Sequence, residues 1–147
     1  AEPRVVMRNL EASLDTASLE PRTRAMSTYL LQEYFIPVRQ FQAFATRMAA
    51  ILQHHHVDAL NVSIRHAPAD TTSLLAWARQ DVFCFVLYHK QRRFPWSDTL
   101  ATGWTRALID AALDCGGSYY LPYRPHATRE QFRRAYPQWQ RFVEAKR

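Results

Sequence analysis

Residues 28–38 read TYLLQEYFIPV, a run of aromatic and β-branched side chains that ends near a proline. This composition is typical of a β-strand, because such side chains pack well on a pleated surface and proline cannot continue the hydrogen-bond ladder. Directly afterwards the spacing of apolar residues changes to three and four, which indicates an amphipathic helix over residues 39–55. The two patterns together predict a strand followed by a helix.

The sequence that follows this strand and helix predicts three more strands and a second long helix. Residues 59–66 (ALNVSIRH) alternate apolar and polar side chains, which is typical of a half-buried strand, and residues 81–90 (DVFCFVLYHK) form another apolar run. A helix is expected over residues 97–113, ended by the pair Gly116 and Gly117. Residues 118–123 (SYYLPY) predict a fourth strand.

The C-terminal part of the sequence predicts a helical tail. Thr128 and Gln131 have the spacing of a capping box that opens one helix. Pro137 fits the first turn of another, and its apolar side chains are expected to face inward. These side chains are Trp139, Phe142 and Val143.

The order of predicted elements is β-α-β-β-α-β with this tail. It predicts an α+β domain of the ferredoxin-like kind, an antiparallel sheet with both main helices on one face. We expect residues 27–147 to form this domain and residues 1–26 to be an approach segment. One face of such a sheet is free to meet a partner, so function is expected there.

Composition narrows the possible functions. The 147 residues are 48% hydrophobic and 22% charged, as expected for one globular domain. Three glycines are too few for the glycine-rich loops that bind dinucleotides or nucleoside triphosphates. No apolar run is long enough to span a membrane, so we expect a soluble, cytoplasmic protein. Cys84 and Cys115 are expected to be buried free thiols.

The sequence predicts a polar group of side chains on the free face. Asn61, Ser63 and Arg65 share one side of the second strand. On the third strand either Val86 and Tyr88, or Phe85, Leu87 and His89, would share that face, and Tyr120 and Tyr123 lie near the end of the fourth. Such a surface suits a flat or polar ligand.

Four segments of the sequence resemble a known family: LLQEYFIP (30–37), NVSIRHAPAD (61–70), FVLYHK (85–90) and GGSYYLPYRPHATREQFRRAYP (116–137). In order and spacing they are similar to the C-terminal, substrate-side domain of FAD-linked oxidases of the vanillyl-alcohol oxidase type. The nearest branches are the sugar-alcohol and aldonolactone oxidases and the decaprenylphosphoryl-ribose oxidases. The resemblance covers most of the chain from residue 30 onward.

The resemblance implies a cofactor and a partner domain. Such enzymes bind FAD mainly through an N-terminal flavin-binding domain, whose isoalloxazine ring the open sheet face would cover. A small hydroxylated substrate, such as a sugar, polyol or lactone, would lie between flavin and sheet and lose a hydride to the flavin. Because the sequence begins without methionine and ends within a helical pattern, we expect it to be part of a longer protein, inactive alone.

The family's site residues carry over in part. A Glu-x-Arg pair in the polyol oxidases corresponds to Ser63-Ile64-Arg65, so the arginine matches and the carboxylate does not. The third-strand polar residue falls at Tyr88, and the lysine after the last strand falls at Tyr123. Arg65 would stabilise negative charge on the reduced flavin, while Tyr123 or Tyr88 would take the substrate proton if an arginine lowered its pKa. Further residues expected to face substrate or cofactor are Asn61, Ser63, Tyr120, Glu33 and His126.

Other interpretations stay open at this point. Arg65 could form a structural ion pair with Glu33, and the tyrosines could serve packing alone. The histidines at 54–56 point in different directions on a helix, and His66, His89 and His126 are scattered, so no metal site is predicted.

A second function class has the same element order. RNA-recognition modules share it, and residues 83–88 (FCFVLY) loosely match their base-stacking strand, although the usual basic-glycine pair is missing and Glu33 would repel phosphate. No nucleic-acid partner is therefore expected. A third possibility is an interaction domain without a ligand.

Overall fold

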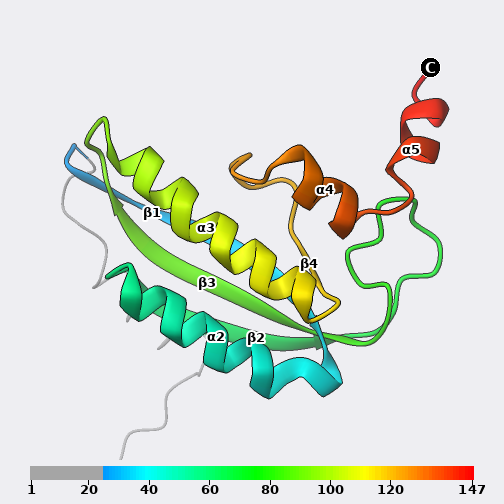
Figure 1. The fold of residues 1–147 in the computed structure, drawn as a ribbon, viewed down its shortest axis with the longest axis horizontal. Coiled ribbons are helices and arrows are strands. Elements are labelled where there is room, and N and C mark those ends of the chain that lie inside the picture. Colours follow the sequence, from blue (N-terminus) through cyan, green and yellow to red (C-terminus); the bar gives the residue numbers. More distant parts are fainter. Residues whose placement is uncertain (1–24) are drawn as a thin grey trace, which may run out of the picture.

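The computed structural model describes residues 25–147, and the predicted approach segment lies almost wholly outside them. Four strands and four α-helices follow one another along residues 25–147 (Figure 1). The elements are β1 (Ser27–Pro37), a 3-10 turn η1 (Val38–Gln40), α2 (Phe41–His54), β2 (Asp58–Ala67), β3 (Val82–Arg92), α3 (Ser97–Asp114), β4 (Ser118–Tyr119), α4 (Arg129–Ala135) and α5 (Trp139–Ala145).

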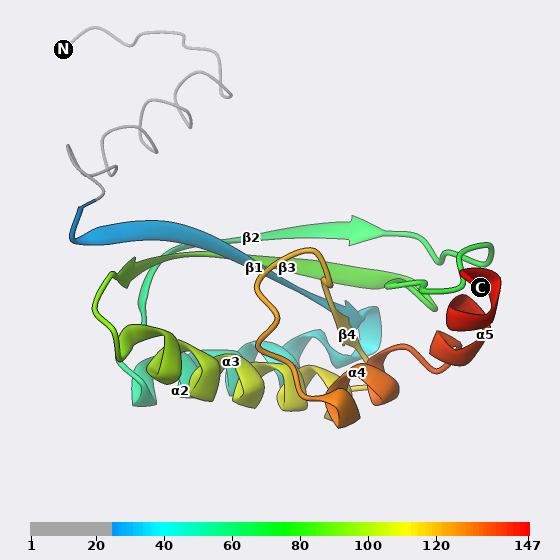
Figure 2. The ribbon, with the colours of Figure 1, turned by 90° about the horizontal axis from the view of Figure 1, so that it is seen from above.

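The four strands form one antiparallel sheet in the order β2-β3-β1-β4. β1 and β3 pair along their whole length, from Ser27 opposite Arg92 to Pro37 opposite Val82. Helices α2 and α3 lie side by side against one face of this sheet, and Figure 2 shows the opposite face without a helix from the described part of the chain. The predicted α+β class with an antiparallel sheet is confirmed.

The main core lies between the sheet and the two long helices. Alternate side chains of β1 and β3 point to this layer, because successive residues of a strand face opposite sides. They meet apolar side chains that recur at helical spacing on α2 and α3, as the sequence predicted. The most completely buried members of the cluster are Tyr34, Ile36, Phe44, Phe85, Leu87, Leu108, Ala112 and Ala135.

The end of α3 is set by the two glycines that the sequence singled out. Gly116 adopts a left-handed conformation with φ of 72°, and its N–H donates to the carbonyl of Leu113 at 2.9 Å. The N–H of Gly117 donates to the carbonyl of Ala112 at 2.8 Å, which completes a Schellman motif. The chain thereby turns back at once to form β4 beside β1.

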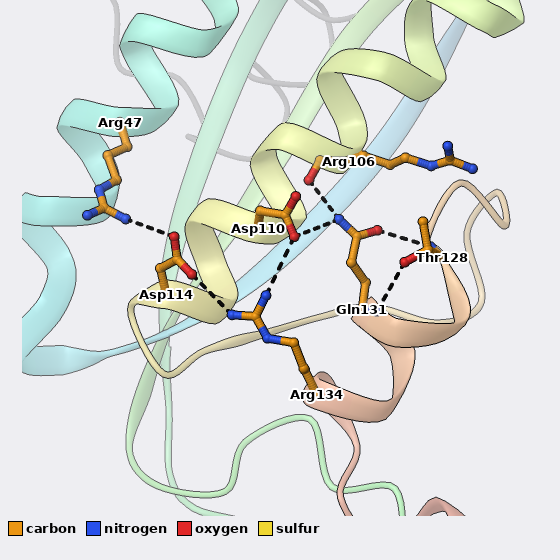
Figure 3. A network of polar contacts seen from close by, with 7 residues as sticks. All are labelled: Arg47, Arg106, Asp110, Asp114, Thr128, Gln131 and Arg134. Atoms are coloured by element: carbon orange, nitrogen blue, oxygen red, sulfur yellow. Dashed lines mark hydrogen bonds and ion pairs between the residues drawn. The ribbon is translucent and has the colours of Figure 1, made fainter.

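Helix α4 is held to α3 by a network of polar contacts (Figure 3). Thr128 and Gln131 form the predicted capping box, with both reciprocal hydrogen bonds present. The Gln131 amide also donates to the carbonyl of Arg106 at 3.0 Å and to Asp110 at 2.8 Å. Arg134 bonds Asp114, which Arg47 of α2 approaches from the other side. This network fixes the start of α4 and the chain just before it.

Two expectations about the fold are wrong. The strand expected over residues 118–123 contains only Ser118–Tyr119, because Pro122 has no N–H for the ladder and the chain turns away before it. Helix α5 buries none of its residues, so Trp139, Phe142 and Val143 do not face a core; α5 packs at the end of the described chain with no apolar layer to cover. The first long helix begins at Phe41, directly after the 3-10 turn, close to the start expected near residue 39.

None of the helices in residues 25–147 has the length and apolar composition required to cross a membrane.

Candidate functional site

The open face of the sheet carries the polar side chains that the sequence placed together. In the pairing of β2 with β3, Asn61 lies opposite Tyr88, Ser63 opposite Val86 and Arg65 opposite Cys84. All of these side chains point away from the helices, since their neighbours along each strand face the core. The shared face of the three β2 residues is therefore confirmed, with their side chains exposed.

The register also decides between the two possible faces of β3. Val86 and Tyr88 lie on the open face, whereas Phe85, Leu87 and His89 are buried on the helix side. The aromatic side chains that suggested an RNA-binding strand also lie on the helix side of the sheet. Phe83 and Phe85 both pack on the ring of Phe41, each with ring centroids 5.3 Å apart. They cannot stack on bases from the open face.

Glu33 and Arg65 approach the middle of the open face from the two strands on either side of β3. Glu33 lies opposite Val86, and Arg65 lies opposite Cys84. Partial burial raises the pKa of Glu33, and the positive charge of Arg65 partly counteracts this rise. The two charges influence each other, which keeps open the structural role that the sequence allowed for this pair.

Two tyrosines cover the N-terminal half of β1 on the open face. The rings of Tyr29 and Tyr88 stack with centroids 5.3 Å apart and planes inclined by 29°. Tyr88, one of the three predicted catalytic residues, therefore packs against a neighbouring strand and lies only partly exposed.

One end of the open face is not free, contrary to expectation. The chain between β2 and β3 folds over it, so that Trp77 lies on Phe35 with ring centroids 4.3 Å apart. The hydroxyl of Ser118 donates to the carbonyl of Trp77 at 2.6 Å and fastens this cover to β4. Phe35, Cys84 and Val82 are thereby buried in a second small core. Burial is also the main cause that raises the pKa of the Cys84 thiol.

A pocket of about 350 Å³ opens at the edge of β1, where β4 stops after two residues. Residues 30–34 of β1 form one wall, Thr105 and Ile109 of α3 form the floor, and residues 119–126 form the other wall. Figure 2 shows this last segment rising beside β1 between β4 and α4. The pocket thus exists because the fourth strand ends early.

Four of the eight predicted site residues line this pocket: Glu33, Tyr120, Tyr123 and His126. The rings of Tyr120 and Tyr123 meet edge to face with centroids 5.1 Å apart. The other four predicted residues, Arg65, Tyr88, Asn61 and Ser63, are on the open face and do not line the pocket. Arg65 still influences the charge of Glu33 and Tyr123, so the two groups lie within electrostatic reach.

The lowered pKa that Tyr123 would need in order to take the substrate proton is not found. Burial raises the pKa of this phenol, and Glu33 and Tyr120 raise it further, while Arg65 only partly opposes them. The Tyr123 hydroxyl therefore remains protonated near neutral pH and can donate a hydrogen bond, but it is a poor proton acceptor.

His126 is held more firmly than the sequence suggested. Only 9% of the residue is exposed, its Nδ1 lies 2.9 Å from the Thr102 hydroxyl, and its carbonyl accepts a hydrogen bond from Arg106. Burial lowers its pKa; Asp98 opposes this, and Arg124 and Arg106 add to the lowering. The imidazole is therefore neutral near pH 7.

Sequence reasoning missed several residues that shape the pocket. Gln32 donates to Thr105 at 2.8 Å and accepts from the Tyr34 hydroxyl, so these three polar groups satisfy one another at the floor. Arg124 forms an ion pair with Asp98 at the rim. The polar Gln32 on the core side of an otherwise apolar alternation was the available signal, because a buried amide requires a partner.

The histidines do not form a metal site. Within residues 25–147 no three histidine, cysteine or acidic side chains are placed to hold an ion. The side chains at residues 54–56 are exposed at the end of α2, as expected. His89 is 1% exposed, and its ring packs edge to face on the ring of Trp104. Among the described residues, neither of its ring nitrogens has a partner that meets the usual hydrogen-bond geometry.

No protein-family model matches the chain, and no curated protein matches it.

Proposed function

We propose that residues 27–147 form a ferredoxin-like, substrate-side domain of an FAD-dependent oxidoreductase that oxidises a hydroxyl group. The strand order β2-β3-β1-β4 with helices on one face is compatible with that fold. The observation that carries the proposal is Arg65, an exposed guanidinium on the sheet face that no helix in residues 25–147 covers. The partner is a flavin-binding domain elsewhere in the same protein, and the substrate is a small hydroxylated molecule.

The chemistry of the open face fits a flavin ring. FAD would accept a hydride from the substrate carbon, as flavins do in such oxidations. Arg65 holds a permanent positive charge where negative charge would develop, and a fixed cation stabilises that charge without reorganisation. Tyr88 and Tyr29 form a stacked aromatic pair further along the same face.

The pocket fits the substrate side of the same reaction. It lies beside Glu33, which shares the open face with Arg65, so a molecule in the pocket would reach the edge of that face. Tyr123 can donate a hydrogen bond to the substrate oxygen, and Tyr120 supports its ring. Asn61 and Ser63 extend the polar surface along β2.

We further propose a cytoplasmic location, which two buried, unpaired cysteines, Cys84 and Cys115, fit.

The test is to produce the protein at its natural length, including any sequence upstream of residue 1, and to record its absorbance spectrum. We expect a co-purified flavin that is bleached anaerobically by an alcohol substrate, whereas residues 25–147 alone neither hold FAD nor turn over. A natural-length protein without a flavin-binding domain, or with a flavin that no alcohol reduces, would contradict the proposal.

A further inference from the structure

The pocket at the edge of β1 has walls that are mainly apolar and aromatic. Its volume of about 350 Å³ is at the small end of the range for small-molecule sites. The residues that give it this character are Leu30, Tyr34, Ile109, Tyr119, Tyr120 and Pro122. Such walls favour a ligand with an apolar body, because burying apolar surface is the main favourable term in binding it.

Most polar groups of the pocket are already occupied. Gln32, Thr105 and Tyr34 bond one another, and Arg124 is paired with Asp98. These groups offer little to a ligand that carries many hydroxyls, since each such hydroxyl would lose water without gaining a partner. The polar groups left to meet a ligand are the Glu33 carboxylate, the His126 imidazole and the hydroxyls of Tyr119, Tyr120 and Tyr123.

The tautomer of His126 follows from its neighbour. The Thr102 hydroxyl donates its single hydrogen to the carbonyl of Asp98 at 2.7 Å. The contact of 2.9 Å between this hydroxyl and Nδ1 of His126 must therefore be a bond that Nδ1–H donates. In the neutral ring Nε2 then carries no hydrogen, so it is a hydrogen-bond acceptor.

The residue is also fixed in place on both sides. Arg106 donates to its carbonyl at 2.8 Å, and the Gln131 amide donates to the carbonyl of Arg106 at 3.0 Å, as Figure 3 shows for Gln131 and Arg106. Because this acceptor is already held in place, little conformational entropy is lost when a ligand binds to it, and this favours binding.

We propose that this pocket binds a small, uncharged and mainly apolar alcohol, whose hydroxyl donates its hydrogen to Nε2 of His126. The inference rests on the proposed function only in taking this alcohol as the substrate. It narrows the substrate class, because the pocket would favour one hydroxyl on an apolar body over a polyol. His126 would bind and orient the hydroxyl, and Glu33 and Tyr123 lie at the same pocket.

The test uses the chain itself, labelled with ¹⁵N, and three probes: benzyl alcohol, benzyl methyl ether and xylitol. We expect benzyl alcohol to shift saturably the amide signals of residues 30–33 and of the non-proline residues within 119–126, together with the Nε2 signal of His126. The ether has the same ring and no donor, so we expect it to bind about five- to tenfold more weakly, as the loss of one hydrogen bond predicts. Xylitol is expected to bind more weakly still.

Two variants separate binding from structure. His126→Asn keeps a donor for Thr102 and has no acceptor at the position of Nε2, so the affinity ratio of alcohol to ether is expected to fall to about one. His126→Gln extends its amide toward the position of Nε2, so a preference for the alcohol is expected to persist. A merely structural role would weaken both probes equally and leave the ratio unchanged.

Several results would overturn the inference: equal binding of the alcohol and the ether to the unaltered chain, tighter binding of xylitol, or signal changes elsewhere in the chain. If a variant fails to fold, the comparison of the probes and the Nε2 signal in the unaltered chain still decides. The binding experiment needs no flavin, so its result does not depend on the proposed function. If the chain binds the alcohol but the natural-length protein shows no flavoenzyme activity, the proposed function is refuted and the pocket assignment stands.

Discussion

Gly117 lies so close to Phe35 that no side chain can be placed there. A Cβ at position 117 would be 2.4 Å from the carbonyl oxygen of Phe35 and 3.0 Å from that of Ala112. Both contacts are to backbone atoms, which cannot move without disturbing β1 or the end of α3. The absence of a side chain thus allows β4 to dock on β1 and sets one wall of the pocket.

Gly117→Ala is expected to destabilise the domain by about 2–4 kcal/mol, because the backbone must shift to accommodate the methyl group. Urea unfolding followed by circular dichroism measures this. Gly103→Ala is the matched control: position 103 is within α3 with no atom near its Cβ, so we expect a gain of about 0.5–1 kcal/mol. Equal effects of the two substitutions would show that the close approach is not as described.

Gln131→Ala should cost about 1–3 kcal/mol of unfolding free energy, since it removes half of the capping box and the hydrogen bonds that this buried amide donates to Arg106 and Asp110. It should also speed hydrogen exchange of the amides at residues 124–128, which measures the order of the pocket wall. Arg134→Ala is the control, because its carboxylate contacts are about half exposed and worth less than about 1 kcal/mol. Unchanged exchange in Gln131→Ala would contradict the role given to the network.

His89 predicts a stability that falls in acid. Burial, with the nearby charges of His126 and Arg124, lowers its pKa from 6.5 to about 4. Between these pH values the unfolded chain binds a proton that the folded chain does not, so stability decreases as the pH falls from about 6.5 toward 4. The expected loss is about 3 kcal/mol over this range.

The measurement is urea unfolding at several pH values, with His89→Leu beside the unaltered chain. The leucine variant should lose most of this pH dependence, while His55→Ala, which changes an exposed histidine, should keep it. His126 adds a smaller effect of the same sign, because its pKa is also lowered. A pH dependence that survives His89→Leu in full would show that another group causes it.

The sequence predicted those parts of the fold that depend on local periodicity. The two-residue alternation in β2 placed Asn61, Ser63 and Arg65 on one face, and the helical spacing around Phe44 identified α2. The Gly116–Gly117 pair marked the end of α3 because a Schellman motif has a local signature.

The pocket could not be predicted in this way, because its walls come together only in three dimensions. Thr105 is 73 residues from Gln32, and Thr102 is 24 residues from His126, yet each pair is in contact. The contact of Trp77 with Phe35 could not be predicted either, since Trp77 is in the chain between β2 and β3 and Phe35 is on β1. Pro122 limited the length of the last strand, but it did not show that β4 would end after only two residues, which leaves the space for the pocket.

The most direct test of the proposed flavoenzyme role is the rate of flavin reduction by an alcohol substrate in the natural-length protein, measured by anaerobic stopped flow. Arg65→Ala is predicted to lower this rate constant by about 10- to 100-fold and to lower the midpoint potential of the flavin, because a charge that stabilises its reduced form is lost. Arg65→Lys should retain part of the reduction rate and part of the midpoint potential. Arg39→Ala, at an exposed position in η1, should change neither the rate nor the potential. An Arg65→Ala protein that reduces its flavin at an unchanged rate and potential would contradict the account.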